Sequence, residues 1–311
     1  MVSGSTRLSS QEAVRKGLAG QRLDVAGAAF RIGLLVTLLM SLLILLVLLA
    51  DIFQDGWPVL RDRGFDFIKA PLSTFSAETA GVWQGVLGSL LTLIFVVLVA
   101  IPLGIAAAIY LEEYATDTRF NRFINVNIRN LAGVPSIVYG LLGLALFVEL
   151  FGGLTGGKSI IAAGLTLAVL VLPIVIITAS EALRAVPRSI REAGYGVGAT
   201  RWEVVRSHVL PSAAPGILTG TVLALARAIG ETAPLLLVGA VTGFLATGNQ
   251  TFLEQLQGRF TTLPTIIFRW ATLPSDLFRR NASAAIIVLL LVIISANGIA
   301  ILLRNRYERR W

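Results

Sequence analysis

Five long stretches of this chain contain no lysine, arginine, aspartate or glutamate, and they limit what it can fold into. They cover residues 32–50, 85–111, 131–148, 159–180 and 281–303. A helix needs about 20 apolar residues to cross the roughly 30 Å hydrocarbon core of a bilayer. Hydrocarbon offers no hydrogen-bond partner to the backbone, and the stretches lack the alternating pattern of barrel strands. We therefore predict an all-α, polytopic membrane protein embedded in a lipid bilayer.

A sixth apolar run, from about Gly216 to beyond Val238, differs because Arg227 and Glu231 interrupt it. A charge at the centre of a bilayer costs about 2.5–3.5 kcal/mol or more and usually faces a partner or a water-filled path. Four residues apart on a helix, the two side chains share one face. A helix starting at Gly216 would place Arg227 about 17 Å deep, near the midplane. We predict that the pair lines a substrate pathway; the alternative is an ion pair that only fixes helix packing.

The composition excludes several kinds of site. The chain has no cysteine and a single histidine, His208, while only 14% of its residues are charged and its mean hydropathy is +0.80. Without cysteine there are no disulfides and no thiolate chemistry, and one histidine cannot form a multi-histidine metal centre. We expect no metal site, and the scarcity of clustered carboxylates at membrane depth argues against a membrane enzyme.

Positive charge is distributed unevenly between the predicted loops. When loops are assigned alternately to the two sides, 17 of the 26 lysines and arginines fall on the side that holds both termini. The positive-inside rule then predicts six spans with both termini in the cytoplasm. The net charge of +8 is explained without a nucleic acid partner. Because about 30 mostly polar residues precede the first apolar run, we interpret that run as a retained span and not a signal peptide.

These spans divide the chain into four parts. We expect a cytoplasmic segment, a first transmembrane helix with an extracytoplasmic loop, a main transmembrane domain and a cytoplasmic tail, at residues 1–29, 30–84, 85–304 and 305–311. Within the main domain, an extracytoplasmic loop at 241–280 mixes apolar and charged residues, which predicts short interfacial helices. Trp83, Trp270 and Trp57 fit an outer aromatic belt.

The cytoplasmic loop 181–215 is too polar to span a membrane, yet its sequence is compatible with helices. Ser189 is a candidate cap for a helix that follows it. The glycines at 194, 196 and 198 permit a tight bend or a close approach of another backbone. We predict a compact helical projection from the membrane.

The residues of this loop resemble the EAA loop of ABC-importer permeases, E-A-A-x3-G-x9-I-x-L-P, in which a short helix docks into a cleft of an ATPase. The matching residues are Glu192, Ala193, Gly194, Gly198, Leu210 and Pro211. Gly194 stands in place of the second alanine and His208 in place of the isoleucine. The resemblance implies a type I ABC importer permease fold, with these six residues coupling the chain to an ATPase.

Three further stretches look like the phosphate-specific ABC importer, in particular its A-type permease subunit. They lie at residues 227–236, 133–140 and 281–290, and the resemblance covers residues 85–304. It implies transport of inorganic phosphate across the bacterial cytoplasmic membrane. The implied partners are a second permease subunit, a dimer of ATP-binding subunits and an extracytoplasmic phosphate-binding protein. A nucleotide-binding G-x4-G-K-[ST] loop is absent, so ATP and Mg are expected on the ATPase, with no cofactor and no catalysis on this chain.

The chemistry of the charged pair fits an anion. Arginine offers a planar fork of donors that stays protonated. We hypothesise that Glu231 pairs with Arg227 when the path is empty and accepts a hydrogen bond from P–OH when phosphate passes. A permease for molybdate, tungstate or sulfate, or an ATP-independent channel, remains an alternative. For residues 133–140, the alternative is that they only shape the start of the third span.

Overall fold

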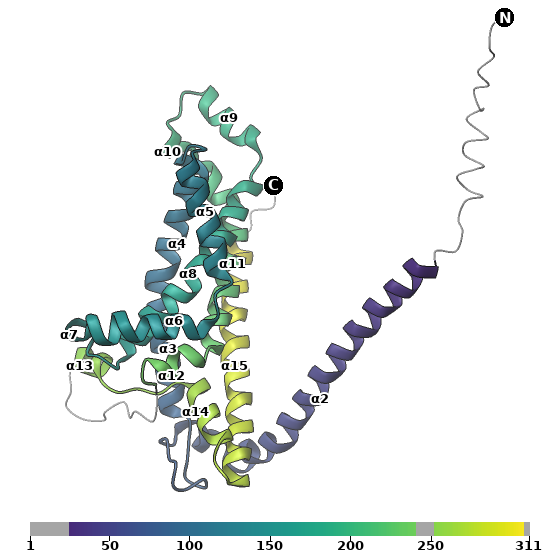
Figure 1. The fold of residues 1–311 in the computed structure, drawn as a ribbon, viewed down its shortest axis with the longest axis vertical. Helices are drawn as coiled ribbons and strands as arrows, with labels where there is room; N and C mark the ends of the chain where they lie inside the picture. Colours follow the sequence, from purple (N-terminus) through teal and green to yellow (C-terminus); the bar gives the residue numbers. More distant parts are fainter. Residues whose placement is uncertain (1–24, 241–251, 308–311) are drawn as a thin grey trace, which may run out of the picture. The chain divides into compact units, whose positions relative to one another are not determined.

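The computed structural model describes residues 25–240 and 252–307, and every regular element in these ranges is helical (Figure 1). The chain forms two units, residues 1–51 and 52–311, and each is described by itself. Among the described helices, five are long and apolar enough to span a membrane, or six if one bent pair counts as a single span. The predicted N-terminal segment 1–29 falls mostly outside the described residues.

The first helix, α2 (Val25–Lys69), contains the predicted span 32–50. It continues well past the predicted end of the apolar run, so that the first part of the expected loop 51–84 is helical. The backbone leaves helical geometry at Gly64, where φ is 49°.

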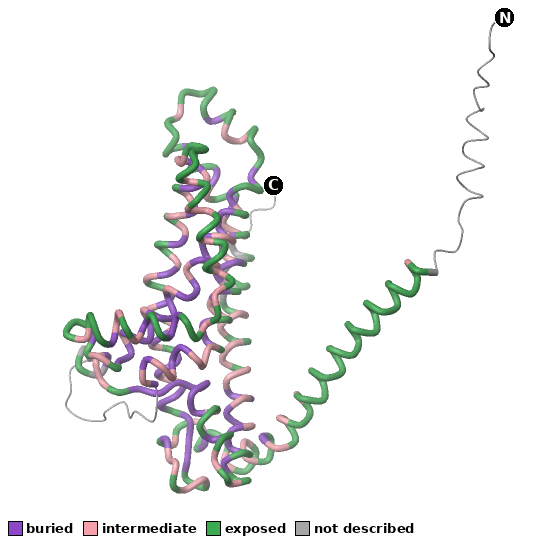
Figure 2. Tube along the Cα trace, viewed as in Figure 1, coloured by how far each residue is buried: buried purple, intermediate pink, exposed green. Residues whose placement is uncertain are grey.

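The second span is a continuous helical rod from Trp83 to Tyr114. It consists of α3 (Trp83–Phe95), the π-helical turn η1 (Val96–Ala100), α4 (Ile101–Ile109) and the π-helical turn η2 (Tyr110–Tyr114). It packs along α8 (Ile160–Ala185), the most buried of the spans. Figure 2 shows the resulting column of buried residues.

The third span is broken. α5 (Arg119–Ala132) and α6 (Ser136–Gly143) meet at an angle of 102°, and η3 (Leu144–Leu150) and α7 (Gly152–Thr155) follow. In Figure 1, α6 runs across the long helices α8 and α11. The prediction of one helix over 131–148 is therefore wrong. Pro135 provides the reason, since it has no N–H to donate and disfavours helical geometry in the residue before it.

The fifth span also departs from the prediction. It is helical from Arg201 to Gly230, through α10 (Arg201–Val204), η4 (Val205–Val209) and α11 (Leu210–Gly230), and a separate short helix follows, α12 (Ala233–Leu237). It does not run past Val238. A continued helix would place Pro234 against the carbonyl of Gly230, four residues earlier, which proline does not tolerate.

The region 241–280, for which short helices were predicted, contains α13 (Phe252–Gln257) and α14 (Leu263–Ala271); residues 241–251 lie outside the described part. The last span is α15 (Asp276–Tyr307). Trp270 of α14 is fully buried, with its ring between Phe67 and Phe278 and its Nε1 donating to the Ser73 carbonyl at 3.2 Å. The prediction that Trp270 joins an outer aromatic belt is therefore wrong, because the residue is a core anchor.

Candidate translocation and coupling sites

Arg227 and Glu231 form an ion pair in the described structure, with Arg227 Nε 3.2 Å from Glu231 Oε1. They do not share a helix face, as the sequence suggested, because α11 ends between them and Glu231 has an extended backbone (φ −74°, ψ 128°). The helix also begins before Gly216, so the depth calculated from that residue has no basis. The Arg227 side chain is 43% exposed and that of Glu231 is 16% exposed. The arginine is thus the accessible partner.

The bend in the third span packs against the break in the fifth. α6 packs on α12, and a Cβ on Gly140 would lie only 2.7 Å from the Cα of Pro234, so a side chain at this position would force the two helices apart. Tyr139 is held by a 2.8 Å hydrogen bond from its hydroxyl to the Leu131 carbonyl. The helix that follows the bend of the third span therefore packs on the helix that follows the break of the fifth span, directly after the charged pair.

The stretch at 281–290 contributes differently. It lies on α15, which packs along α11, so all three stretches belong to one packed region. Asn281 itself is buried, and its Nδ2 donates to the Ala77 carbonyl at 2.7 Å. Its side chain fixes a loop and is not part of the charged pair.

Within the predicted loop 181–215, residues 186–200 fold into a helical projection between α8 and the fifth span. Its helix α9 (Arg188–Gly196) begins after Pro187, and no side chain caps it, so the prediction that Ser189 is the cap is wrong. Gly198 has φ +82°, a left-handed conformation that strongly favours glycine. Thr200 and Glu203 then form a capping box that starts the next helix. The predicted bend is confirmed at Gly198.

The six coupling residues are not equivalent in the structure. Glu192, Ala193, Gly198 and Pro211 are exposed, Leu210 is half-buried, and Gly194 is buried. A Cβ at Gly194 would lie 2.7 Å from Cγ2 of Val204, which explains the departure from alanine at this position. His208 is exposed in η4, next to the start of α11. The exposed members are available to a partner, and their coupling role stays a prediction.

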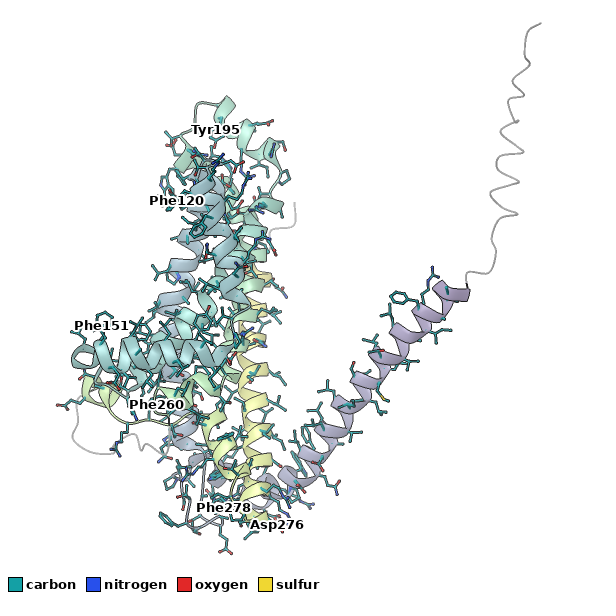
Figure 3. The ribbon with its side chains drawn as sticks, in the orientation of Figure 1. Phe120, Phe151, Tyr195, Phe260, Asp276 and Phe278 are labelled. Carbon is teal, nitrogen blue, oxygen red and sulfur yellow. The ribbon has the colours of Figure 1, made fainter. Side chains whose placement is uncertain are left out.

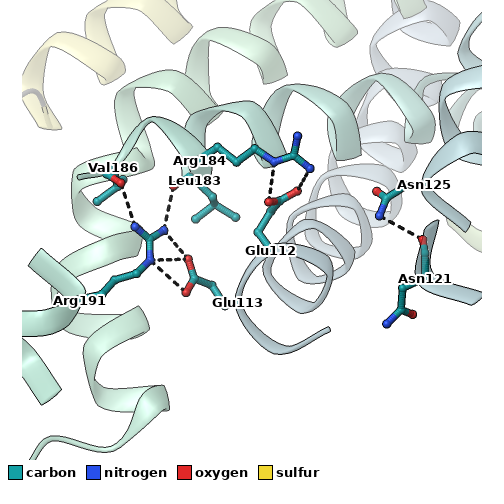
Figure 4. A network of polar contacts seen from close by, with 8 residues as sticks. All are labelled: Glu112, Glu113, Asn121, Asn125, Leu183, Arg184, Val186 and Arg191. Atoms are coloured by element: carbon teal, nitrogen blue, oxygen red, sulfur yellow. Dashed lines mark hydrogen bonds and ion pairs between the residues drawn. The ribbon is translucent and has the colours of Figure 1, made fainter. Parts of the chain in front are cut away.

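Sequence reasoning missed a network of ion pairs beneath this projection (Figure 4). Glu112 accepts hydrogen bonds from Arg184 Nε and Nη2 at 2.7 and 2.8 Å. Glu113, only 4% exposed, accepts from Arg191 Nη2 at 2.6 Å and from Arg191 Nε at 3.1 Å. The available signal was the pair of adjacent carboxylates at the end of an apolar run, together with the arginines of the predicted loop 181–215. An open cavity of about 430 Å³ adjoins the network.

The family defined as "Binding-protein-dependent transport system inner membrane component" matches residues 100–311. The chain belongs to this family. It is therefore an ABC permease and a multi-pass membrane protein, and proteins of this family are not themselves catalytic.

Related proteins include permeases of phosphate transport systems. The chain is 34% identical over 230 residues to "Phosphate transport system permease protein PstA 1" of Mycobacterium tuberculosis, covering 74% of this chain and 71% of that protein. It is 35% identical over 223 residues to "Phosphate transport system permease protein PstA" of Yersinia pestis, covering 71% of each. A "Probable ABC transporter permease protein YqgI" of Bacillus subtilis is 36% identical over 178 residues, or 57% of this chain and 59% of that one.

Solved structures support the fold. A bacterial ABC transporter involved in the import of the acidic polysaccharide alginate aligns with a TM-score of 0.59 at 14% identity, covering 96% of this chain and 99% of the other. The MetNI methionine ABC transporter, in an inward-facing conformation, aligns with a TM-score of 0.54 at 18% identity over 74% and 95% of the two chains. The type I ABC importer permease fold is confirmed. Within this permease fold, Arg227 and Glu231 lie at the break of the fifth span, next to α12, which packs on α6 of the third span.

Proposed function

We propose that this chain is a permease subunit of an ATP-driven importer that carries inorganic phosphate across the bacterial cytoplasmic membrane, with both termini in the cytoplasm. The observation that carries the proposal is the Arg227–Glu231 pair at the break of the fifth span, directly before α12, which packs on α6 of the third span. The relatives named as phosphate transport permeases support the choice of substrate.

The exposure of the two side chains suits an anion that visits and leaves. Arg227 keeps 43% of its side chain accessible while its Nε contacts Glu231, so the outer edge of the guanidinium is open to a ligand. Phosphate oxygens match the arginine fork with two parallel hydrogen bonds. In the absence of phosphate, Glu231 keeps the arginine charge compensated.

The glutamate then serves as the selectivity element. A carboxylate repels an anion, but it also accepts a hydrogen bond, and phosphate at neutral pH has a P–OH group that sulfate lacks. An acceptor beside the arginine fork would therefore favour phosphate over sulfate. A site that binds a substrate hydroxyl rejects the analogue without it because a buried polar group is then left unpaired.

The partners follow from the exposed side chains of the projection. Glu192, Ala193 and Gly198 are open to a docking ATPase subunit, which would bind ATP and Mg and would occur as a dimer. A second permease subunit completes the pathway, and an extracytoplasmic phosphate-binding protein delivers the substrate at the opposite side.

The test is a reconstitution of the purified complex in proteoliposomes. We expect the chain to co-purify with an ATPase subunit, and phosphate with its binding protein to stimulate ATP hydrolysis and drive uptake of labelled phosphate. Sulfate, molybdate and tungstate serve as controls. Stimulation by one of those anions and not by phosphate would replace the proposed substrate, and conduction without ATP would indicate a channel.

A further inference from the structure

We infer that the Glu113–Arg191 ion pair transmits movement of α9 into the second span, which carries it as one rod to α14 at the opposite end of the bundle. The inference rests on the proposed function only in that an ATPase docks at α9. Neither residue belongs to the motif that resembles the EAA loop. Glu113 and Arg191 are thus positioning residues that act at a distance from the substrate path.

The first link is the contact itself. Arg191 of α9 uses Nε and Nη2 on the Glu113 carboxylate, and it also donates from Nη1 to the Val186 carbonyl at 2.8 Å and from Nη2 to the Leu183 carbonyl at 3.0 Å. Those two carbonyls are at the end of α8, and that of Leu183 also accepts from the Val186 N–H at 3.3 Å. One guanidinium therefore ties together α9, the end of α8 and η2, as Figure 4 shows.

Burial makes this link strong. The exposed fractions of the side chains are 4% for Glu113 and 18% for Arg191. Removing one member of a buried pair leaves an uncompensated charge in a region of low dielectric, which is strongly unfavourable. The two members are therefore expected to move together. The neighbouring bidentate pair of Glu112 with Arg184 fixes the same turn to α8.

The second link is the rod. The span from Trp83 to Tyr114 contains 32 residues, which is about 48 Å at the rise of an α-helix. Its middle contains the π-helical turn η1, where the regular α-helical hydrogen bonds are interrupted. At this turn Val96 and Ala100 are buried in the same core cluster as Val171 and Val175 of α8. The packing braces the rod where its hydrogen-bond pattern changes.

The third link is the far end of the rod. Ser89 Oγ accepts a 2.9 Å hydrogen bond from the backbone N–H of Leu263, the first residue of α14. A side chain at Gly88 would clash with the Thr261 carbonyl, so the rod and the segment before α14 are in direct backbone contact. In Figure 3, Tyr195 of α9 and Phe278, which packs on Trp270 of α14, mark opposite ends of the bundle. The second span is thus anchored at both ends, by Glu113 to α9 and by Ser89 to α14.

The covalent route from α9 to the fifth span is less constrained. It passes through Gly198, whose left-handed turn is exposed and has nothing within 4 Å of the position of a Cβ. The route through Glu113 is buried and has several hydrogen bonds. α9 also packs directly on the fifth span, where a Cβ at Gly194 would lie 2.7 Å from Cγ2 of Val204, so the Glu113 route adds a separate polar connection that leads to the second span.

The experiment follows α14 while the ATPase turns over. Because the chain has no cysteine, a single Phe268→Cys substitution gives one labelling site in this subunit, on an α14 side chain that is 51% exposed. In the full complex, with the partner subunits free of cysteine, we expect the rate of labelling by a membrane-impermeant maleimide to differ between nucleotide-free and vanadate-trapped ATP states. In Glu113→Gln the difference should largely disappear, and transport per ATP hydrolysed should fall about tenfold or more, since a buried partner is lost.

Three further variants make the result decisive. Glu113→Asp keeps the charge and should restore part of the response, while Arg191→Lys keeps the charge but loses the carbonyl bonds, and should give an intermediate loss with the complex still assembled. Asp117→Asn is the matched control, since it removes the ion pair between Arg122 and Asp117, whose side chains are 74% and 83% exposed. Glu113→Gln and Arg191→Lys complexes that assemble and retain the full labelling response at position 268 would overturn the inference.

The labelling experiment also separates the two proposals. It requires ATP and an assembled complex but no particular substrate. A wild-type background whose α14 label responds to ATP, yet which imports no phosphate, would overturn the proposed substrate and leave the inference intact. A complex that imports phosphate with no labelling response at position 268 would overturn the inference and leave the proposed substrate intact.

Discussion

Two of the glutamate–arginine pairs in the described part of this permease use the same chemistry in opposite ways. The pair formed by Arg227 and Glu231 has one contact of 3.2 Å at the end of a helix, and its arginine is 43% exposed. The pair formed by Arg191 and Glu113 has several hydrogen bonds, and its carboxylate is 4% exposed. A weakly held charge is available to a ligand, whereas a fully bonded one connects structural elements. The number of bonds and the burial of each pair therefore indicate its role.

The largest expected effect comes from truncating the buried pair. Glu113→Ala should lower the free energy of unfolding by about 3–5 kcal/mol, because it leaves the Arg191 charge unpaired in the interior. Glu231→Ala should cost clearly less, because Arg227 is accessible to water. Thermal unfolding of the detergent-solubilised complex measures both variants. Equal losses of unfolding free energy in the two variants would contradict the proposed difference between the two pairs.

The next effect is on transport. Arg227→Ala should reduce phosphate uptake by about two orders of magnitude, in line with the roughly 2–5 kcal/mol lost when a charged hydrogen-bonding partner is truncated. Arg227→Lys should recover only part of this, because it lacks the planar fork. Uptake in proteoliposomes containing equal amounts of assembled complex is the measurement. Near-normal uptake in Arg227→Ala would mean that the pair only fixes packing.

A smaller effect concerns selectivity. Glu231→Gln keeps the size of the side chain and replaces one acceptor oxygen with a donor. We expect sulfate to compete with phosphate roughly tenfold better than in the unmodified protein, because discrimination by a lost hydrogen bond is of this order or larger. Competition between labelled phosphate and unlabelled sulfate measures the ratio. Because the amide oxygen of glutamine still accepts a hydrogen bond, Glu231→Leu is tested beside it, and an unchanged ratio in both variants would exclude the role of Glu231 as P–OH acceptor.

The smallest effect is expected at the exposed pair of Arg122 and Asp117, which serves as the reference for both others. Exposed ion pairs contribute about 0–1 kcal/mol. Asp117→Asn should therefore change neither the unfolding temperature measurably nor the transport rate. A clear loss of transport would show that exposure is a poor guide to the function of ion pairs in this protein.

Two spans were predicted well from their apolar runs. One of these runs contains no proline, and the other contains a proline that the helix accommodates without a break. α8 contains Pro173 and α15 contains no proline, and both follow their apolar runs closely. The third and fifth spans could not be drawn correctly from hydropathy, because an apolar run looks the same whether the backbone continues or turns. Pro135 and Pro234 were visible in the sequence, but the packing of Gly140 on Pro234 was not.

Only part of the candidate site could be predicted from the sequence. Arg227 and Glu231 stand out because they interrupt an apolar run and are four residues apart. The partners of Glu112 and Glu113 are 72 and 78 residues away along the chain, and only the packing of η2 against α8 and α9 brings them together. Trp270 was misplaced for a similar reason, since its burial depends on Phe67, about 200 residues earlier. Contacts between residues far apart in the sequence, and not local helix preference, determine the partners of Glu112 and Glu113 and the burial of Trp270.

The glycine at position 194 has a consequence for engineering this permease towards the pattern of its relatives. Restoring the alanine of the motif would place a methyl group 2.7 Å from Cγ2 of Val204, a fully buried side chain whose branched rotamer cannot move easily. Gly194→Ala, which would complete the E-A-A pattern that this loop resembles, would therefore destabilise the protein. It becomes acceptable only together with Val204→Ala, so the two positions have to be exchanged as a unit.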